Sequence, residues 1–421
     1  MRLTVLGSGT SVGVPTIGCH CDVCRSADPR DNRLRPSVLL RYRDRAVLVD
    51  TTPDFRTQAL RAGLERLDAV LFTHEHADHI MGLDDVRPFN FRQKRPIPVY
   101  GSAQTLEAIR RCFRYVFANA EKAGAIPKLE LHELDGAPFD LFGLRVEPIR
   151  LEHGGLPVFG YRFGRLAYLT DHSSIPESSL GQLRGLDVLF LDALRHNPHP
   201  THSTVAESLK TVERLGPRRT WFTHICHDLP HARTEEKLPP HVRLAYDGLE
   251  IEAPDPVRVY RSLEETPEYF GLSALTIGNF DGVHAGHRSI LRRVRDVARE
   301  NGWTAAALTF DPHPTRVVAP SRIPRLMTTP AGRCRLMEEE GIEQVVILPF
   351  TDAVARMDPE EFVRRIVVER LGARVVLVGD NFRFGHKQAG DTARLRELGA
   401  RLGFTVEVVP PVSLRGQAVS S

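Results

Sequence analysis

A cluster of metal-capable side chains directly after an apolar run constrains the fold of this chain more than any other feature. The run LDAVLFT has the length of a strand, and HEHADH follows it at His74–His79. Three histidines and one aspartate within six residues can act together only if a strand delivers them to one loop, where side chains converge on a common point. The sequence therefore predicts a sheet that carries a metal-binding loop at the end of a strand.

The first half of the chain is predicted to be rich in strands. The chain has 421 residues, and roughly 150 residues per domain predicts two or three domains. Apolar runs of strand length occur at RLTVLG, SVLLRY, AVLVDT, DAVLFT, RVEPIRL, RLAYLT, DVLFLDAL, TWFTH and VRLAYDGLEIE. Helical patterns are fewer there, and we expect helices over residues 103–117 and 204–215. Ser203 can cap the start of the second helix, and Gly216 can end it.

The second half shows a regular alternation of strands and helices after the stretch EAPDPVRVY. Apolar runs at SALTIGNF, TAAALTF, QVVILPF, RVVLVGDN and FTVEVV alternate with helical patterns over residues 287–300, 331–340, 359–371 and 392–402. Strands that are apolar on both faces and separated by helices predict a parallel, doubly wound sheet. We therefore expect a first domain over residues 1–253, a linker at 254–256 and a second domain over 257–421. Of the 18 histidines, 14 precede residue 254, so metal chemistry is expected in the first domain.

The composition excludes some classes of protein. No apolar run approaches the roughly 20 residues that a membrane span needs, so no membrane association is expected. The opening residues MRLTVLGSGTS lack the pattern of a secretion signal, and we expect a cytoplasmic protein. A net charge of +3 gives no support for nucleic-acid binding. The sequence does not indicate an oligomeric state.

Further metal-capable residues stand at the ends of later strand-like runs. His153 follows VEPIRLE, Asp171 follows LAYLT, and His224 follows TWFT. Any one of these histidines could be solvated or cap a helix, but their joint placement after strands favours one shared site. Together with His74, His76, Asp78 and His79 they form a nitrogen and oxygen set that suits zinc, manganese or iron.

These residues resemble the metallo-β-lactamase fold, whose THxHxDH motif is seen here at Thr73–His79. The resemblance spans residues 1–253 and implies an αββα sandwich with two divalent metals, zinc or manganese. It implies that His74, His76 and His153 hold one metal, that Asp78, His79 and His224 hold the other, and that Asp171 bridges them. It also implies a catalytic role for Asp78. Two neighbouring metals can activate water for attack on a phosphorus or carbonyl centre, so hydrolysis is the expected reaction.

The stretch PTHSTVAESL indicates which type of bond is cleaved. It offers His202 before a helix, and its HST triplet resembles the catalytic histidine motif of the phosphodiesterase branch, such as ribonuclease Z. A histidine there can protonate a leaving alkoxide or bind a phosphate oxygen. The alternative is that His202 merely belongs to the helix start. We expect phosphodiester hydrolysis rather than cleavage of a β-lactam or a thioester.

The stretch GCHCDVCR predicts a second kind of metal site. Six cysteines are too few and too unevenly spaced for a disulfide framework, whereas thiolates at Cys19, Cys21 and Cys24 suit a tetrahedral structural zinc. His227 is a candidate for the fourth ligand, and Cys226 is its rival. The cluster resembles that of phosphoribosyl cyclic phosphate diesterases from phosphonate breakdown and of a pyrroloquinoline quinone biosynthesis protein. The resemblance implies a small cyclic phosphate ester as the substrate.

The stretch LTIGNFDGVHAGHRSIL suggests a phosphate-binding loop in the second half. Glycines permit close approach of the backbone, a helix N-terminus favours anions, and two histidines three residues apart can reach one phosphate chain. The candidate residues are Gly278, Asn279, Asp281, His284, Gly286 and His287. A plain turn between a strand and a helix is the alternative reading of this stretch.

This half resembles the FAD synthetase, or FMN adenylyltransferase, module of bacterial bifunctional riboflavin kinases along residues 257–421. The matching pieces are GNFDGVHAGHR, TFDPHP at Thr309–Pro314 and VGDNFRFG at Val378–Gly385. The resemblance implies a Rossmann-like nucleotidyltransferase that makes FAD from FMN and ATP with magnesium. His284 and His287 would stabilise the transition state, and Asn381 would contact the nucleotide.

The sequence departs from this family in one place. The family pattern continues as Ser-Ser-Thr-x-Ile-Arg, whereas the sequence ends at Ser420 and Ser421, so we expect a module that is incomplete at its C-terminal end. The second half could then be only a flavin- and ATP-binding module rather than a synthetase. For the first half a ribonuclease Z-like nuclease is the alternative, and the small net charge argues against it.

Overall fold

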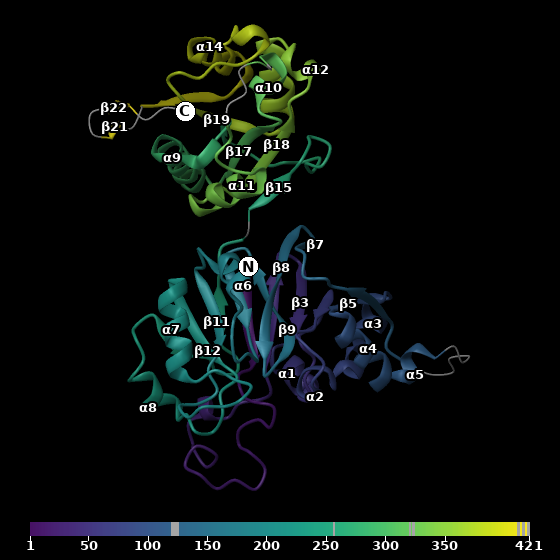
Figure 1. Ribbon diagram of the computed structural model, residues 1–421. Coiled ribbons are helices and arrows are strands. Elements are labelled where there is room, and N and C mark those ends of the chain that lie inside the picture. The colour runs from purple at the N-terminus through teal and green to yellow at the C-terminus, as the bar shows by residue number, and fades with distance from the viewer. Residues whose placement is uncertain are drawn as a thin grey trace. The chain divides into compact units, whose positions relative to one another are not determined.

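The computed structural model divides the chain into two compact units, Met1–Asp255 and Pro256–Ser421 (Figure 1). It describes residues 1–118, 126–255, 257–319, 321, 325–410, 413–414 and 417–418. Ser420 and Ser421, where the sequence departs from the family pattern, lie outside the described residues. None of the described helices is both long enough and apolar enough to cross a membrane. We call the two parts unit 1 and unit 2.

Unit 1 contains two sheets of seven strands each. The first sheet has the order β14 (Glu250–Glu252), β1 (Arg2–Gly7), β2 (Ser37–Tyr42), β3 (Arg45–Val49), β4 (Ala69–Leu71), β5 (Ile97–Gly101) and β6 (Leu129–Glu133). The second has the order β13 (Val242–Leu244), β12 (Arg219–Thr223), β11 (Val188–Asp192), β10 (Leu166–Leu169), β9 (Leu156–Phe163), β8 (Leu144–His153) and β7 (Phe139–Leu141). The predicted strand-rich first half is therefore confirmed.

Alternation along the strands explains why the two sheets pack face to face. In β2, Val38 and Leu40 enter the core between the sheets, whereas Leu39 enters a second core under the helices. In β11, Phe190 faces the other sheet while Leu189 packs toward the outer helices. Because successive strand residues point to opposite faces, strands that are apolar throughout require a covered surface on both sides. The result is the predicted αββα sandwich.

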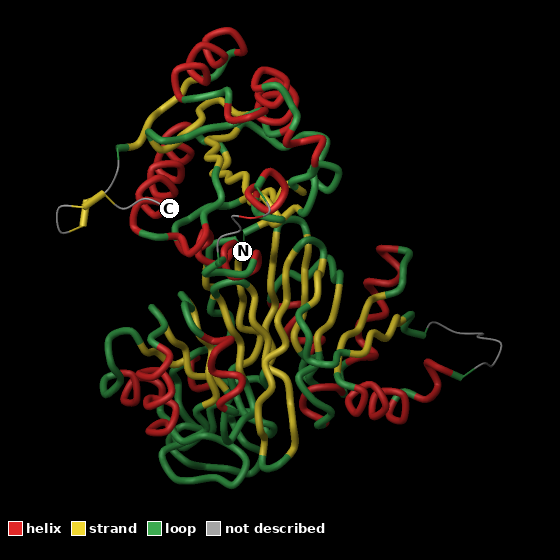
Figure 2. Tube along the Cα trace, turned by 45° about the horizontal axis from the view of Figure 1, so that its top comes forward, coloured by secondary structure: helices red, strands yellow, loops and turns green. Residues whose placement is uncertain are grey.

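The helices of unit 1 cover the outer faces of the two sheets (Figure 2). Their bounds are α1 (Phe55–Arg61), α2 (Ala77–Ile80), α3 (Arg87–Gln93), α4 (Ala103–Cys112), α5 (Arg114–Phe117), α6 (Glu177–Leu180), α7 (Val205–Leu215) and α8 (His231–Glu235). Residues of α1, α3 and α4 pack against the first sheet, and residues of α7 pack against the second. The predicted helix over 103–117 is wrong in one respect, because it breaks at Phe113, where φ is −110° and ψ is 38°.

Helix α7 forms where the sequence predicts it, but with a different cap. Thr204, not Ser203, is the N-cap: its hydroxyl accepts a hydrogen bond from the Glu207 amide at 3.2 Å. The carboxylate of Glu207 in turn accepts one from the Thr204 amide at 2.8 Å. This reciprocal pair is a capping box. Gly216 ends the helix with a φ of +62°, which glycine adopts without steric cost.

Unit 2 contains a six-stranded sheet in which every pairing is parallel. Its order is β15 (Arg258–Tyr260), β18 (Gln344–Pro349), β17 (Thr304–Asp311), β16 (Ser273–Ile277), β19 (Ala373–Gly379) and β20 (Thr405–Val409). Strands β16 to β18 progress toward one edge, and β19 and β20 progress toward the other. The order therefore reverses between β16 and β19, and open α/β sheets bind ligands at such a switch point. This sheet confirms the predicted doubly wound fold.

The helices of unit 2 largely follow the predicted pattern. They are α9 (Ala285–Asn301), α10 (Pro314–Val318), α11 (Pro330–Glu339), α12 (Asp352–Ala355), α13 (Pro359–Phe362) and α14 (Thr392–Leu402), and β21 (Ser413–Leu414) pairs with β22 (Gln417–Ala418). Helix α9 begins two residues before the predicted start at 287, because the His284 side chain caps it. The predicted helix over 359–371 is α-helical only at α13 and continues as a π-helix over Val363–Arg370.

Candidate functional site

Seven side chains from strand-end loops meet at one end of the sandwich in unit 1. Two groups form, each with its ligand atoms within 4.8 Å of one another: His74, His76 and His153; and Asp78, His79, Asp171 and His224. Asp171 lies between the groups, since its Oδ2 is 3.2 Å from His79 Nε2 and 3.9 Å from His74 Nε2. Four of them, His74, His76, Asp78 and His79, follow β4 of one sheet; His153 ends β8, and Asp171 and His224 follow β10 and β12, of the other. The two sheets thus each supply part of the site.

The free nitrogens of these histidines fit a pair of divalent cations. The Nδ1 of His153 donates to the carbonyl of Thr201 at 2.8 Å, which leaves its Nε2 available. Both ring nitrogens of His224 are buried without a hydrogen-bond partner among the described residues, although Nε2 lies 3.3 Å from Asp171 Oδ2. Imidazoles that have one ring nitrogen held by the protein and the other facing a buried carboxylate are arranged as metal-ligating histidines are. The donor set therefore fits the two metals that the fold implies.

Asp50, which follows β3, orients two of the histidines and was not identified from the sequence. Its Oδ2 accepts hydrogen bonds from His79 Nδ1 at 2.8 Å and from the Thr73 hydroxyl at 2.9 Å. The Thr73 oxygen also lies 3.0 Å from His74 Nδ1. Both rings are thereby turned so that Nε2 faces the site. The only sequence signal was the aspartate that ends AVLVD.

The backbone of the site is strained at three places. Asp50, Asp171 and His224 have φ values of 66°, 49° and 58°, in a region that residues other than glycine seldom occupy. Such conformations cost of order 1–3 kcal/mol each and persist where the surroundings impose them. Asp50 and His224 directly follow β3 and β12, Asp171 stands two residues after the end of β10, and each directs a polar side chain into the site. The strain is thus the local cost of turning these side chains inward.

Charge in the site is arranged for cations. Burial lowers the pKa of His74 well below its usual value, so this ring is neutral and can act as a ligand. Burial also opposes the charged form of His224, but Asp171 outweighs it and raises the pKa to about 9. For Asp171 burial works against ionisation, yet His224 and His79 hold its pKa well below the usual range. The buried carboxylates are therefore ionised and favour the binding of cations at this point.

His202 lies beside this centre and pairs with Asp192 at the end of β11. Its Nδ1 donates to Asp192 Oδ2 at 2.8 Å, which leaves Nε2 free on the other side of the ring. The ring stacks on His224 with centroids 4.4 Å apart and lies 4.7 Å from that of His153. Its side chain is about 10% exposed. Because Thr204 caps the following helix, the position of His202 is not explained by the helix start. Asp192 was not identified from the sequence.

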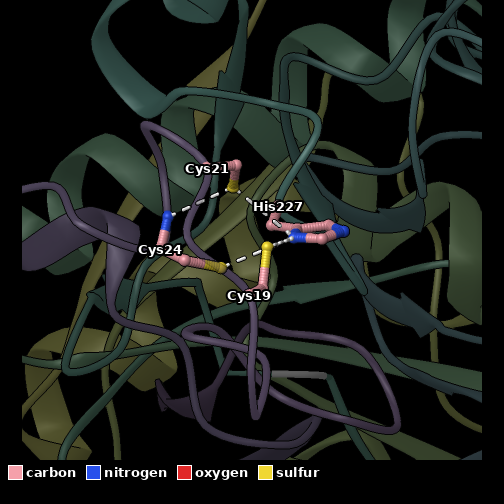
Figure 3. Close-up of side chains that lie close together, drawn as sticks. All are labelled: Cys19, Cys21, Cys24 and His227. Atoms are coloured by element: carbon pink, nitrogen blue, oxygen red, sulfur yellow. Dashed lines mark hydrogen bonds between the residues drawn. The ribbon is translucent and has the colours of Figure 1, made fainter.

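The cysteine cluster gathers around a single imidazole nitrogen, as Figure 3 shows. His227 Nδ1 lies 3.2 Å from Cys19 Sγ, 3.6 Å from Cys21 Sγ and 3.4 Å from Cys24 Sγ. These four side chains form one metal-capable group among the described residues. The rival Cys226 stands apart, and its sulfur accepts a hydrogen bond from the Asp228 amide at 3.3 Å. Three sulfurs and one nitrogen fit a tetrahedral structural zinc.

A buried arginine fixes the loop that carries His224 and His227. Arg33 is 1% exposed, and it donates to the carbonyls of Cys226 at 2.8 Å and Leu229 at 2.7 Å. Its charge is balanced by Asp31 at 2.9 Å. The same loop thus contributes one histidine to the cysteine cluster and one to the seven-residue site. The two metal-capable groups are mechanically linked.

In unit 2 a cavity of about 800 Å³ lies at the switch point of the sheet. The predicted residues that line it are Gly278, Asn279, His284, Gly286 and His287 after β16, and Asn381 after β19. Arg356, Arg383 and Lys387 add positive charge to its wall. Asp281 is the exception among the predicted residues: its carboxylate accepts hydrogen bonds from the amides of Met327 and Thr328 at 2.8 and 2.9 Å. It therefore shapes the loop.

The two histidines of this cavity lie one above the other. The rings of His284 and His287 stack with centroids 3.7 Å apart. His284 Nε2 and His287 Nδ1 are buried without a hydrogen-bond partner among the described residues. Burial, and then His284, lower the pKa of His287 to about 4, so both rings can approach without mutual charge repulsion. The unpartnered nitrogens are available to a ligand in the cavity.

Both units match known families. Residues 45–225 match the β-lactamase superfamily domain, and residues 267–421 match FAD synthetase. A structure described as a new diphosphatase from the PhnP family is 52% identical, with a TM-score of 0.56, and the match covers 60% of this chain and 97% of that one. Zn²⁺-bound PqqB from Methylobacterium extorquens is 20% identical with a TM-score of 0.50 over 60% of this chain and all of its own, which shows the fold alone.

Curated relatives match one unit at a time. The bifunctional riboflavin kinase/FMN adenylyltransferase of Pseudomonas fluorescens is 40% identical over 155 residues, which are 37% of this chain and 49% of that protein. An octanoyltransferase of Porphyromonas gingivalis is 43% identical over 254 residues, which are 59% of this chain and 51% of that protein. The chain thus spans about half the length of the curated relatives it matches.

Proposed function

We propose that the chain joins a dimetal phosphodiesterase to an FMN adenylyltransferase. Unit 1 belongs to the PhnP family within the β-lactamase superfamily, and residues 267–421 of unit 2 match FAD synthetase. The convergence of seven metal-capable side chains supports the first activity. The cavity lined by GNFDGVHAGH residues supports the second. We assign the hydrolase to residues 1–253 and the transferase to 257–421, with 254–256 as the linker.

In the proposed hydrolase His74, His76 and His153 would hold one divalent cation, and Asp78, His79 and His224 the other, with Asp171 shared. Zinc and manganese both suit this donor set. When bound, the cations would supply charge for a phosphate and a nucleophile at neutral pH. Asp50 holds His79 in the tautomer whose Nε2 faces the site. A separate zinc in the cysteine cluster would be structural.

His202 is the proposed general acid. Its Nε2 would give a proton to the leaving oxygen as the phosphorus–oxygen bond breaks, and Asp192 would stabilise the charged ring through the Nδ1 hydrogen bond. The proposed substrates are small cyclic phosphate esters. A diphosphate ester is the second candidate, since the 52% identical structure is described as a diphosphatase.

In the proposed transferase an oxygen of the FMN phosphate attacks the α-phosphorus of ATP, and the bond to the pyrophosphate oxygen breaks. His284 and His287 lie at the helix start where phosphates bind, and their unpartnered nitrogens would contact the reacting group. Asn381 would contact the nucleotide from the other side of the switch point. Magnesium would offset charge on the pyrophosphate.

Hydrolysis of bis(p-nitrophenyl) phosphate by the manganese- or zinc-loaded chain tests the first activity. Asp78→Ala should abolish turnover, whereas Asp85→Ala should not, because Asp85 belongs to none of the metal-capable groups among the described residues. A cyclic ribose phosphate and a diphosphate diester should then be compared as substrates. Absence of turnover on all three by a metal-loaded chain would refute the proposal.

Formation of FAD from FMN and Mg-ATP, followed by chromatography, tests the second activity. His287→Ala should reduce it by at least about 10²-fold, and Arg299→Ala, at an exposed position of α9 that does not line the cavity, should leave it unchanged. Binding of both FMN and Mg-ATP without FAD formation would instead identify unit 2 as a flavin- and ATP-binding module. Absence of both binding and synthesis would refute either role.

A further inference from the structure

A buried arginine of α11 lies behind the loop that carries the GNFDG residues. Arg333 is 1% exposed and does not line the cavity. Its Nη1 donates to the Thr309 hydroxyl at 2.8 Å and to the carbonyl of Phe310 at 3.2 Å. The Thr309 hydroxyl donates onward to the carbonyl of Asn279 at 3.1 Å. A continuous chain of hydrogen bonds therefore runs from Arg333 to the cavity wall.

A second set of contacts fastens the same loop to the residues that precede α11. The carboxylate of Asp281 accepts hydrogen bonds from the amides of Met327 and Thr328 and from the Thr328 hydroxyl. The Gly282 amide donates to that hydroxyl at 3.2 Å. The loop is thus held at two points, by Asp281 at its middle and through Asn279 at its start. Its backbone is fixed before any ligand arrives.

The charge of Arg333 has no direct counter-ion in the part of the chain that the structure describes. Among the described residues no ion pair involves Arg333, and the buried carboxylate of Glu340 pairs with Arg288 and Arg292 instead. The Nε of Arg333 is buried without a hydrogen-bond partner in the same described part. Asp281 acts on it only through space, because that carboxylate is used by Met327 and Thr328. Burying an unpaired guanidinium is expensive. An anion on the other side of Asn279 and Thr309 would offset this cost.

We propose that Arg333 is a positioning residue for the phosphate-binding loop of unit 2, and that the phosphate groups of a nucleoside triphosphate balance its buried charge. The inference rests on the proposed adenylyltransferase function and names a residue that acts from behind the cavity. It follows that Arg333 affects the triphosphate and leaves the nucleoside part of the ligand unaffected. Its two hydrogen bonds hold Thr309 and Phe310 in place. Its positive charge attracts the phosphates from the far side of these two residues.

Displacement of a fluorescent ATP analogue from the full chain by Mg-ATP and by adenosine tests the proposal. Arg333→Met should weaken Mg-ATP by about tenfold or more, leave adenosine unchanged and flatten the dependence of the Mg-ATP affinity on salt. Arg299→Met, at an exposed position of α9, makes the same change in net charge and should alter neither ligand. Arg333→Lys should recover most of the Mg-ATP affinity.

Thr309→Val provides a second variant if Arg333→Met does not fold, because it removes one link of the chain and keeps the charge. It should weaken Mg-ATP by a few-fold. Equal Mg-ATP affinity in Arg333→Met and Arg299→Met, or equal weakening of adenosine and Mg-ATP in a folded Arg333→Met, would overturn the inference. If the wild-type chain does not bind Mg-ATP, the proposed transferase function itself fails, which is a separate outcome.

Discussion

His202 donates a hydrogen bond from Nδ1 to Asp192 at 2.8 Å, at the point where β11 ends beside the seven-residue site. The carboxylate fixes the tautomer of the ring, so that Nε2 is the nitrogen available to a substrate. His202 lies ten residues later, in the loop that leads from β11 to α7, so the pairing depends on how this loop folds back. The reaction proposed for unit 1 depends on this pair when the leaving oxygen needs a proton.

Asp192→Asn should therefore impair His202 selectively. With a cyclic ribose phosphate, whose leaving group is a poor one, we expect kcat to fall by about 10²-fold or more. With a p-nitrophenyl ester, whose leaving group needs little protonation, the loss should be below about tenfold. The measurement is kcat for both substrates in both proteins at equal metal content. An equal loss on both substrates would show that Asp192 supports the metals instead.

Asp50→Asn should weaken metal binding without removing a metal ligand. Asp50 accepts hydrogen bonds from His79 and Thr73, and loss of such an orienting carboxylate typically costs 10- to 100-fold in metal affinity. Competition with a chelator would measure the affinity of the dimetal site. Asp54→Asn serves as the control, because Asp54 pairs with Arg35 outside the site. Unchanged affinity in Asp50→Asn would contradict the orienting role.

Cys21→Ser should lower the thermal stability of the protein while most of its hydrolase activity remains. We expect one zinc fewer per chain by elemental analysis and a melting temperature lower by more than about 5 °C. Folded protein loaded with manganese should keep most of its hydrolase activity. Cys112→Ser is the matched control, since this exposed thiol belongs to none of the metal-capable groups among the described residues. Unchanged melting with lost activity would place the cluster in catalysis.

The unfolding of unit 2 should depend on pH through His287. Burial and His284 lower its pKa from 6.5 to about 4, so the unfolded chain takes up the proton first as the pH falls. The free energy of unfolding should therefore be steady above pH 7 and decrease by about 1–3 kcal/mol between pH 6.5 and pH 4. His287→Gln should flatten this decrease, measured by denaturant unfolding at several pH values. Arg299→Gln, at an exposed position of α9, should leave the decrease intact, and an equal effect of both substitutions would contradict the assignment.

The parts of the fold that the sequence predicts are those with strong local signals. The six residues His74–His79 follow a strand in both the sequence pattern and the structure, and α14 occupies the predicted residues 392–402. Strand β9 was missed because Pro157 and Gly160 interrupt its apolar run, and pairing with β8 along its whole length forms it nonetheless. The stretch VRLAYDGLEIE has the pattern of one strand, but it forms β13 and β14 in different sheets.

The supporting residues of the sites were not predictable in the same way. Asp50 and Asp192 are single carboxylates at strand ends, and nothing nearby in the sequence marks them. Their roles arise from partners that are 29 and 10 residues away. Asp281 is the opposite case. Its place in a motif predicts a ligand contact, but its carboxylate accepts hydrogen bonds from the amides of Met327 and Thr328. Tertiary contacts decide such roles.

The loop that begins at His224 limits how this protein can vary in evolution. His224 and His227 are three residues apart and face two different metal-capable groups, while Arg33 holds the carbonyl between them. An insertion or deletion within this loop would displace a donor from one group or the other. Relatives are therefore expected to change the length of distant loops freely and to keep this spacing.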